Sequence, residues 1–207
     1  MWTRRIFLKK WFLGSLIFSF CGRFFSNSWA QAKKLLPKGL PKDQIIEMNP
    51  ADIDNRELEI DPLDEFGTMG PTDIKMDLET YRLNIKGKVG NHLSLSFDQI
   101  KRFPSISEVV LLICPGFFAN NGHWTGVSLK TLLTESQVEE GAQFVEIRAE
   151  EKVVKIPLEE LQLKKVLLAY QVNGQTLPQK HGFPIRLVLE DHYGNEWVKY
   201  VNEIVVS

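Results

Sequence analysis

The sequence predicts an α+β fold with a mixed β-sheet core and short helices. Two observations lead to this prediction. Strand-like runs rich in β-branched residues recur from Tyr81 to the C-terminus, and the few segments of helical period between them are short. Several strands with few helices are typical of the α+β class, so we expect a mixed sheet at the core.

The expected elements follow one another in a simple order. YRLNIKGKV alternates as a strand that ends by Gly90, and SFDQIKRF is a helix capped by Ser96 and stopped by Pro104. SEVVLLIC is a buried strand that ends at Cys114, and SLKTLL is a short helix capped by Ser128. Further strands are expected at AQFVEIRAE, KVVKIPL, VLLAYQVNG, FPIRLVLE and WVKYVNEIVV, with one short helix near LEELQ.

The N-terminus has the features of an export signal. Arg4 and Arg5 lie in a basic start without acids, and an apolar stretch follows at residues 11–25. TRRIFLK resembles the twin-arginine signal, and small residues offer a cleavage site after Ala30 or Ala32. The apolar stretch is short and interrupted for a membrane span, although an uncleaved signal that anchors the protein is an alternative. We expect a periplasmic or otherwise exported protein.

Three parts make up the predicted chain: a twin-arginine signal peptide at 1–32, an irregular lead-in at 33–60 and one domain at 61–207. The lead-in mixes Lys, Pro and acids without a period, so we expect it to wrap the domain. Loss of the signal removes five basic residues and no acid, which lowers the formal net charge from −1 to −6. An acidic surface argues against nucleic-acid binding.

Cys114 has no expected disulfide partner, because the other cysteine, Cys21, lies in the signal. A free cysteine is commonly a small buried hydrophobe, but an unpaired thiol in an oxidising compartment is a liability unless a metal bond protects it. A nucleophile with His123 or His181 as its base is a second interpretation. Zinc is disfavoured because no closely spaced ligand pair is present.

The third interpretation is a thiolate ligand to a soft transition metal whose other ligands come from a cofactor. Molybdenum bound to the dithiolene sulfurs of a pyranopterin meets that condition. Such a cofactor also agrees with twin-arginine export, a route that carries folded proteins.

From Pro62 to the C-terminus the sequence resembles the sulfite-oxidase superfamily of molybdopterin enzymes. The family's strand ending in cysteine, followed by Trp-x-Gly-Val/Phe-x-Leu, is matched by Cys114 and WTGVSL. Its later phosphate-side pattern is matched by HGFPIRL, then YG, then WVK. The resemblance implies the sulfite-oxidase fold, a molybdenum-molybdopterin cofactor, and Cys114 as the metal ligand and catalytic residue.

The later motif implies a site for the phosphate of the pterin. Arg186 grips the phosphate with a planar fork and Lys199 acts as a point charge, while His181 donates a further hydrogen bond. The backbone amides of Trp197 and Val198 complete the cradle. Taken alone, Arg186 and Lys199 are ordinary surface charges, and their place in the motif favours the cofactor role.

DEFGT resembles the part of periplasmic methionine-sulfoxide reductase catalytic subunits that lies against the pterin. Asp61, Asp64 and Glu65 are therefore expected to accept hydrogen bonds from the pterin ring, with an acidic loop as the alternative. Ala149 or a neighbour stands where the family has a hydroxyl-bearing residue near the cofactor, and Glu190 stands where the family usually has proline.

PGFFANNGH, at residues 115–123, is unlike the corresponding segment of well-described members. We expect it to be a loop that lines the substrate side. Asn120, Asn121 and His123 are candidate substrate contacts, although loop asparagines are often turn formers.

The resemblance implies an exported oxidoreductase that transfers an oxygen atom. We expect it to reduce a sulfoxide, either a small molecule or a sulfoxide carried by a protein. The chain stops at Ser207 without the dimerisation domain of sulfite oxidases, which favours a monomeric sulfoxide reductase over a sulfite dehydrogenase. A non-catalytic binding domain without metal is a further alternative. No C-x-x-C-H haem motif or flavin fingerprint is present, so electrons are expected to pass through a separate membrane haem protein or cytochrome c.

Overall fold

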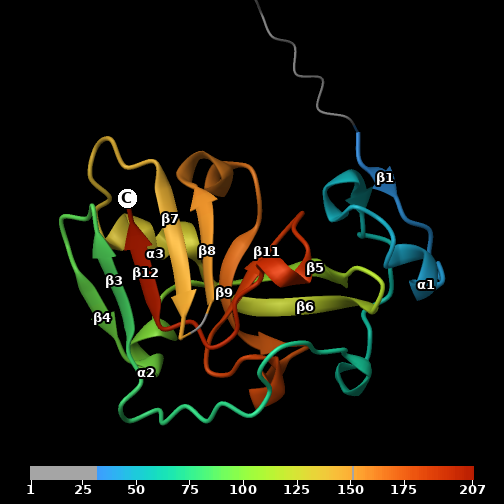
Figure 1. Ribbon diagram of the computed structural model, residues 1–207, viewed down its shortest axis with the longest axis horizontal. Coiled ribbons are helices and arrows are strands. Elements are labelled where there is room, and N and C mark those ends of the chain that lie inside the picture. The colour runs from blue at the N-terminus through green and yellow to red at the C-terminus, as the bar shows by residue number, and fades with distance from the viewer. Residues whose placement is uncertain (1–31, 151) are drawn as a thin grey trace, which may run out of the picture. The chain divides into compact units, whose positions relative to one another are not determined.

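The computed structural model describes residues 32–150 and 152–207, and the basic and apolar parts of the expected signal lie outside them. No helix in the described ranges is long and apolar enough to cross a membrane. The strands in chain order (Figure 1) are β1 (Lys34–Leu35), β2 (Ile53–Asp54), β3 (Leu83–Gly87), β4 (Leu93–Leu95), β5 (Ser105–Cys114), β6 (Phe118–Ser128), β7 (Phe144–Ala149), β8 (Lys152–Pro157), β9 (Val166–Val172), β10 (Gln175–Thr176), β11 (Arg186–Leu189) and β12 (Glu203–Val206).

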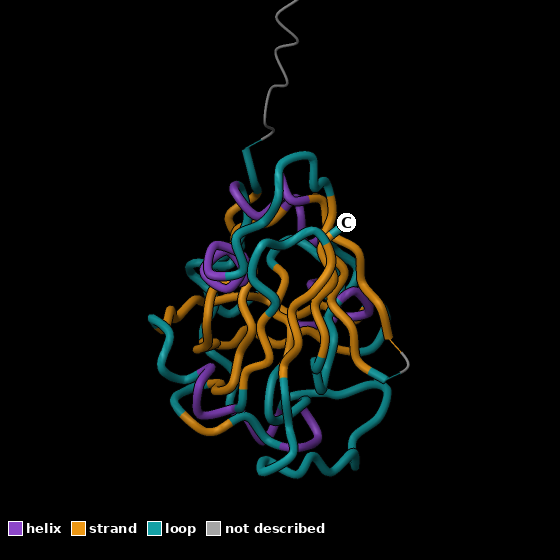
Figure 2. The backbone as a smooth tube through the Cα atoms, turned by 90° about the vertical axis from the view of Figure 1, so that its left-hand side faces the viewer, coloured by secondary structure: helices purple, strands orange, loops and turns teal. Residues whose placement is uncertain are grey.

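The helices are short. The α-helices are α1 (Lys42–Ile45), α2 (Phe97–Ile100) and α3 (Leu129–Glu135), and the 3-10 helices are η1 (Pro50–Asp52), η2 (Leu63–Glu65), η3 (Leu158–Gln162), η4 (Gln179–His181) and η5 (Gly194–Glu196). Figure 2 shows strands running through the centre of the described body, with loops and short helices around them.

Two five-stranded sheets carry the fold, which confirms the predicted α+β class. One has the order β10-β9-β6-β5 with β11 paired to β9, and all of its pairs are antiparallel. The other has the order β4-β3-β12-β7-β8 and is mixed, because β12 runs parallel to β3. The main apolar core includes fully buried Leu83, Trp124, Ile147 and Leu167, which come from strands of both sheets.

Local signals for the helices were largely correct. Ser96 and Gln99 form a reciprocal capping box at the start of α2. Ser128 precedes α3 as expected, but its side chain makes no capping hydrogen bond. The strand expected to end by Gly90 ends at Gly87, where a φ of 98° turns the chain away from the sheet.

The expectation that residues 115–123 form a loop is wrong. β5 and β6 make one long hairpin in which Cys114 pairs with Phe118, so only the short turn between these two residues is irregular. Gly116, with a φ of 72°, permits that turn. Asn120, Asn121 and His123 therefore lie within β6, and their backbones are paired with β5.

The lead-in packs on this hairpin and forms an apolar cluster separate from the main core, in agreement with the expectation that it wraps the domain. Asp61 anchors its end, because its Oδ2 accepts from the amide of Asn121 at 2.8 Å and its own amide donates to the Asn121 carbonyl at 2.9 Å. The buried members of the cluster are Leu36, Ile45 and Ile53 from the lead-in and Leu111, Ile113 and Ala119 from the hairpin.

Replacement of Leu36 by alanine is expected to lower the free energy of unfolding by about 2–5 kcal/mol, because the side chain is fully buried against the hairpin. Leu35→Ala is the matched control, since that neighbouring side chain is 50% exposed and its loss should change stability by at most about 0.5 kcal/mol. Urea denaturation of both variants measures the difference. Equal effects would contradict packing of the lead-in on β5 and β6.

Candidate active site

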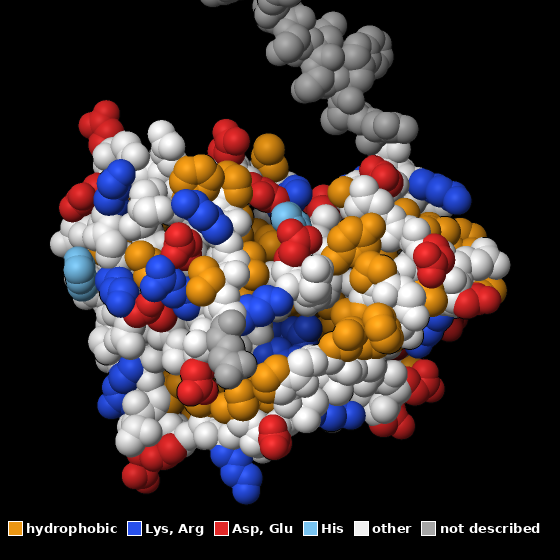
Figure 3. All heavy atoms as spheres, viewed as in Figure 1, with side chains coloured by type: hydrophobic (Ala, Val, Ile, Leu, Met, Phe, Trp, Pro, Cys, Tyr) orange, Lys and Arg blue, Asp and Glu red, His pale blue; other side chains and the backbone are white. Residues whose placement is uncertain are grey.

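A cavity of about 800 Å³ lies at the C-terminal end of β5. Its walls come from residues 67–76, the end of β5, the turn between β7 and β8, the start of β11 and residues 194–202. Figure 3 shows Lys and Arg side chains inside a hollow on this face of the molecule, with hydrophobic side chains beside it. The cavity therefore combines a basic interior with apolar walls.

Cys114 ends β5 and lines this cavity with a sulfur that has no disulfide partner among the described residues. Gly194 approaches it closely, since a Cβ built on that glycine would lie 2.6 Å from the sulfur. Burial raises the pKa of the Cys114 thiol. The positive charges of Arg186, Lys199 and Lys152 oppose that shift. Burial thus favours the neutral thiol over the thiolate, and a bond to a metal would stabilise the thiolate instead.

The protein supplies few other metal ligands here. In the part of the chain that the structure describes, no group of three or more His, Cys, Asp or Glu side chains is arranged to hold a metal ion. A metal bound at Cys114 must therefore bring most of its ligands with it, as molybdenum does in a pterin dithiolene.

Arg186, the first residue of β11, is the main positive charge of the cavity. Its guanidinium lies over the rings of Trp124 and Trp197, at 5.4 and 5.2 Å from their centroids, and is only 4% exposed. Burial lowers its pKa to about 10. Its one protein hydrogen bond among the described residues runs from Nη1 to the His181 carbonyl at 3.0 Å. The charge is thus buried without a carboxylate partner.

Three buried nitrogens in the described ranges have no hydrogen-bond partner, and all belong to the later motif: His181 Nε2, Arg186 Nε and Trp197 Nε1. Each such group costs about 1–3 kcal/mol when left unsatisfied. Burial and the nearby Arg186 charge lower the pKa of His181 to about 4, so its ring is neutral at pH 7 and can still donate one hydrogen bond. An anion with several acceptor oxygens fits this set, as the phosphate of molybdopterin does.

Lys199 ties two segments together at the edge of the cavity. Its Nζ donates to the Thr68 hydroxyl at 2.6 Å and to the carbonyls of Lys180 and Pro71 at 2.9 and 3.0 Å. Burial and the Arg186 charge lower its pKa to about 8. Lys199 thus holds residues 67–71 over the basic end of the cavity.

The structure brings five of the predicted cofactor residues to one cavity: Cys114, Ala149, Arg186, Trp197 and Lys199. His181 lies behind them and contacts Arg186 through its carbonyl. Val198 is fully buried, and its carbonyl accepts from the Leu187 amide at 2.8 Å, so it supports the wall from behind.

The predicted acidic contacts lie off the cavity. The Asp61 carboxylate instead accepts a hydrogen bond from the Asn121 amide and forms an ion pair with Lys42 at 2.9 Å. Asp64 and Glu65 are exposed in η2. The residues that follow them in DEFGT, Gly67 and Thr68, line the cavity instead. The segment DEFGT therefore reaches the cavity through its last two residues, and the three acidic side chains do not line it.

The three predicted substrate contacts are also absent from the cavity lining. The Asn120 side chain accepts from the Gly67 amide at 2.9 Å. The Asn121 side chain binds Asn55 and lead-in carbonyls, and the His123 amide donates to Asn173 at 2.9 Å. The side chains of Asn120 and Asn121 thus connect β6 to Gly67 and to the lead-in, and the backbone of His123 connects β6 to the turn after β9.

Sequence reasoning missed several lining residues, among them Lys152, Asn195 and Tyr200. Lys152 donates to the Asn195 carbonyl and so connects the β7–β8 turn to η5. Gly194 carried a usable signal, since it lies in the YG part of the motif. The others come together only through tertiary contacts.

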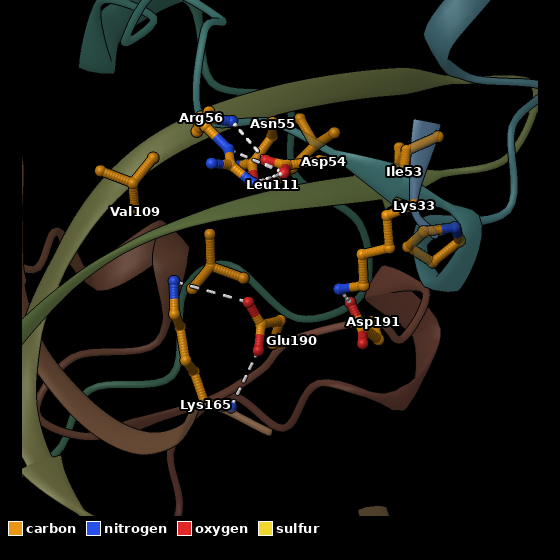
Figure 4. Close-up of a pocket in the computed structure, with 12 residues that line it drawn as sticks. Lys33, Ile53, Asp54, Asn55, Arg56, Val109, Leu111, Lys165, Glu190 and Asp191 are labelled. Atoms are coloured by element: carbon orange, nitrogen blue, oxygen red, sulfur yellow. Dashed lines mark hydrogen bonds and ion pairs between the residues drawn. The ribbon is translucent and has the colours of Figure 1, made fainter. Parts of the chain in front are cut away.

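A second cavity, of about 290 Å³, lies between the lead-in, β5 and the segment after β11 (Figure 4). Its charged side chains are paired with one another: Lys33 with Asp191, Arg56 with Asp54, and Lys165 with Glu190. Because its charged side chains neutralise one another, this cavity has no uncompensated charge that would favour a charged ligand. The cavity lined by Cys114 and Arg186 differs in this respect.

Comparison with known proteins gives the family. Residues 69–207 match the family described as oxidoreductase molybdopterin binding domain. The uncharacterized oxidoreductase YuiH of Bacillus subtilis (strain 168) is 31% identical over 130 residues, 62% of this chain and 66% of that protein. The putative protein-methionine-sulfoxide reductase subunit YedZ1 of Azospira oryzae is 25% identical over 134 residues, 64% of this chain and 51% of the relative.

Human mitochondrial sulfite oxidase is 30% identical over 167 residues, which cover 64% of this chain and 30% of that protein. The crystal structure of the sulfane dehydrogenase SoxCD from Paracoccus pantotrophus matches with a TM-score of 0.61 and 26% identity, over 68% of this chain and 44% of the other. The chain spans no more than 66% of the length of these curated relatives. It belongs to the oxidoreductase molybdopterin binding domain family, with the sulfite-oxidase fold and a site for molybdenum-molybdopterin.

Proposed function

We propose that the protein is an exported molybdopterin-dependent oxidoreductase that transfers an oxygen atom, with an organic sulfoxide as its substrate. One observation carries this proposal: the Cys114 sulfur lines the same cavity as the buried, unpaired Arg186 guanidinium. A metal ligand and an anion site in one cavity match the two ends of the cofactor. When bound, the molybdenum centre supplies the two-electron redox chemistry.

In this proposal the residues of the chain bind the cofactor and fix its position. Arg186, His181 and Trp197 would hold the phosphate through nitrogens that lack partners among the described residues. Cys114 binds the metal at the end of a buried strand, where strand pairing fixes its backbone. Lys199 holds the segment with Thr68 at the wall of the cavity.

The cavity walls support an organic substrate. Met69, Ile74, Met76 and Phe118 give one side of the cavity an apolar surface. Of the cationic side chains at the cavity, Lys199 already donates three hydrogen bonds to other protein groups. A neutral sulfoxide, small or carried by a protein, suits this surface better than sulfite. Sulfite oxidation is the alternative, because sulfite oxidase is among the relatives.

We further propose that the protein works as a monomer with a separate electron-transfer partner, a membrane haem protein or a cytochrome c. The sequence has no haem or flavin motif of its own. The Azospira oryzae relative is named as a subunit, which supports a partner.

Export by the twin-arginine route is also part of the proposal, and an uncleaved signal would leave the protein anchored to the membrane. Changing Arg4 and Arg5 together to lysine is expected to keep the protein in the cytoplasm, since this route requires the arginine pair. Arg23→Lys is the control and should export normally. Cell fractionation with N-terminal sequencing measures both location and cleavage. Export of the double variant at the wild-type level would contradict this route.

Wild-type protein purified from the exported fraction is expected to contain stoichiometric molybdenum and pterin and to reduce sulfoxides. Cys114→Ser should retain pterin through the phosphate site, lose or alter the metal centre and lose activity. Elemental analysis and pterin fluorescence after denaturation measure the two components separately. Wild-type protein with neither component would leave a non-catalytic binding domain.

Arg186→Lys is expected to reduce pterin retention at least about tenfold, because lysine lacks the planar fork and the stacking surface for Trp124 and Trp197. Arg102→Lys, at an exposed position, is the matched control. Pterin content after gel filtration is the measurement. Full retention in Arg186→Lys would argue against a phosphate at this guanidinium.

A further inference from the structure

The segment of residues 190–196, here named the wall segment, connects β11 to Trp197 and packs against the end of β5. Its closest approach is at Gly194, where an added Cβ would lie 2.6 Å from the Cys114 sulfur and 2.7 Å from Leu112. The position of this backbone therefore limits where the sulfur can lie. The contacts that hold the wall segment in place, here called its anchors, therefore affect the position of the Cys114 sulfur.

Two of these anchors are visible in Figure 4. Glu190 accepts from the Lys165 amide at 3.0 Å and pairs with the Lys165 ammonium at 3.5 Å. Asp191 pairs with Lys33 of the lead-in at 2.5 Å. Both contacts hold the start of the wall segment.

His192 provides the third anchor and is the one connected to Gly194. Its Nε2 lies 2.6 Å from a carboxylate oxygen of Glu160 in η3, and its Nδ1 lies 3.0 Å from a carboxylate oxygen of Glu196. The Lys164 ammonium also faces Nε2, at 3.3 Å, and pairs with Glu160 at 2.6 Å. Each ring nitrogen of His192 therefore lies within hydrogen-bond distance of a carboxylate oxygen. His192 thus bridges η3 to η5.

Glu196 carries this restraint to the glycine. Its second carboxylate oxygen accepts from the Tyr193 amide at 3.2 Å, and its own amide donates to the Tyr193 carbonyl at 2.9 Å. These bonds close the turn that contains Gly194. The Trp197 amide then donates to the Gly194 carbonyl at 3.2 Å. A continuous set of hydrogen bonds therefore runs from Glu160 to the backbone that touches Cys114.

We propose that His192, bridging Glu160 and Glu196, is a positioning residue that holds Gly194 against the Cys114 sulfur. Its effect on the thiol follows from the protein geometry alone. Its effect on a bound metal rests on the proposed function.

Alkylation of the metal-free, full-length protein by iodoacetamide tests the effect on the thiol. His192→Ala is expected to raise the alkylation rate of Cys114 about tenfold under native conditions, because loss of the bridge increases local opening of the wall segment. His92→Ala removes an exposed histidine in the turn before β4 and is the matched control, expected to leave the rate unchanged. Equal rates in wild type and both variants would overturn the proposal.

Two measurements distinguish positioning from general destabilisation. His192→Gln keeps a donor toward one carboxylate and is expected to give an intermediate rate. Amide hydrogen exchange in His192→Ala should rise at Glu196 and Trp197 and stay unchanged in β3 and β12. Alkylation rates that follow the melting temperature, with faster exchange in every strand, would refute a positioning role.

In the metal-loaded protein, His192→Ala is expected to shift the sulfur-to-metal charge-transfer absorption while the metal content stays constant. Unchanged absorption together with unchanged alkylation overturns the inference. Wild-type protein that binds no molybdenum would overturn the proposed function instead, and the alkylation rates would then decide the role of His192.

Discussion

The buried guanidinium of Arg186 is the constraint on which the architecture of the site depends. It lies over the rings of Trp124 and Trp197, which belong to the main core, and no carboxylate of the described residues compensates its charge. An unpaired buried charge is strongly destabilising. Two tryptophans and the His181 carbonyl offset part of this cost. In the proposed function the phosphate of the cofactor would offset the rest, and cofactor binding would then stabilise the folded protein.

The long hairpin of β5 and β6 connects that constraint to the rest of the chain. Its inner face contributes Leu112 and Trp124 to the main core, and its tip carries Cys114. Its outer face needs the lead-in, whose Leu36 is fully buried there. The lead-in thus stabilises the strand that carries Cys114, although residues 33–60 do not line the cavity that contains the Cys114 sulfur.

Local patterns predicted the elements well, because the strands and capped helices depend on neighbours in sequence. The capping box at Ser96 and the strand that ends at Cys114 are examples. The prediction of a loop at PGFFANNGH was wrong because the conformation of this segment depends on residues distant in sequence. Its asparagines look like turn formers, but partners distant in sequence satisfy them, such as Asn55 for Asn121 and the Gly67 amide for Asn120. The later motif identified Arg186 and Trp197, whereas lining by Lys152 or Tyr200 depends on how the two sheets meet.

Glu190 shows how a departure from the family pattern is accommodated. The family usually has proline there, and proline restricts the backbone covalently but cannot donate a hydrogen bond. In this chain the Glu190 amide donates to the Lys165 carbonyl at 3.0 Å, and its carboxylate accepts from the Lys165 amide. Hydrogen bonds and charge therefore restrain the wall segment where the family uses a ring. The start of the wall segment is thus restrained by Lys165, which directly precedes β9, and by Lys33 of the lead-in, while His192 connects its end to Glu160 of η3.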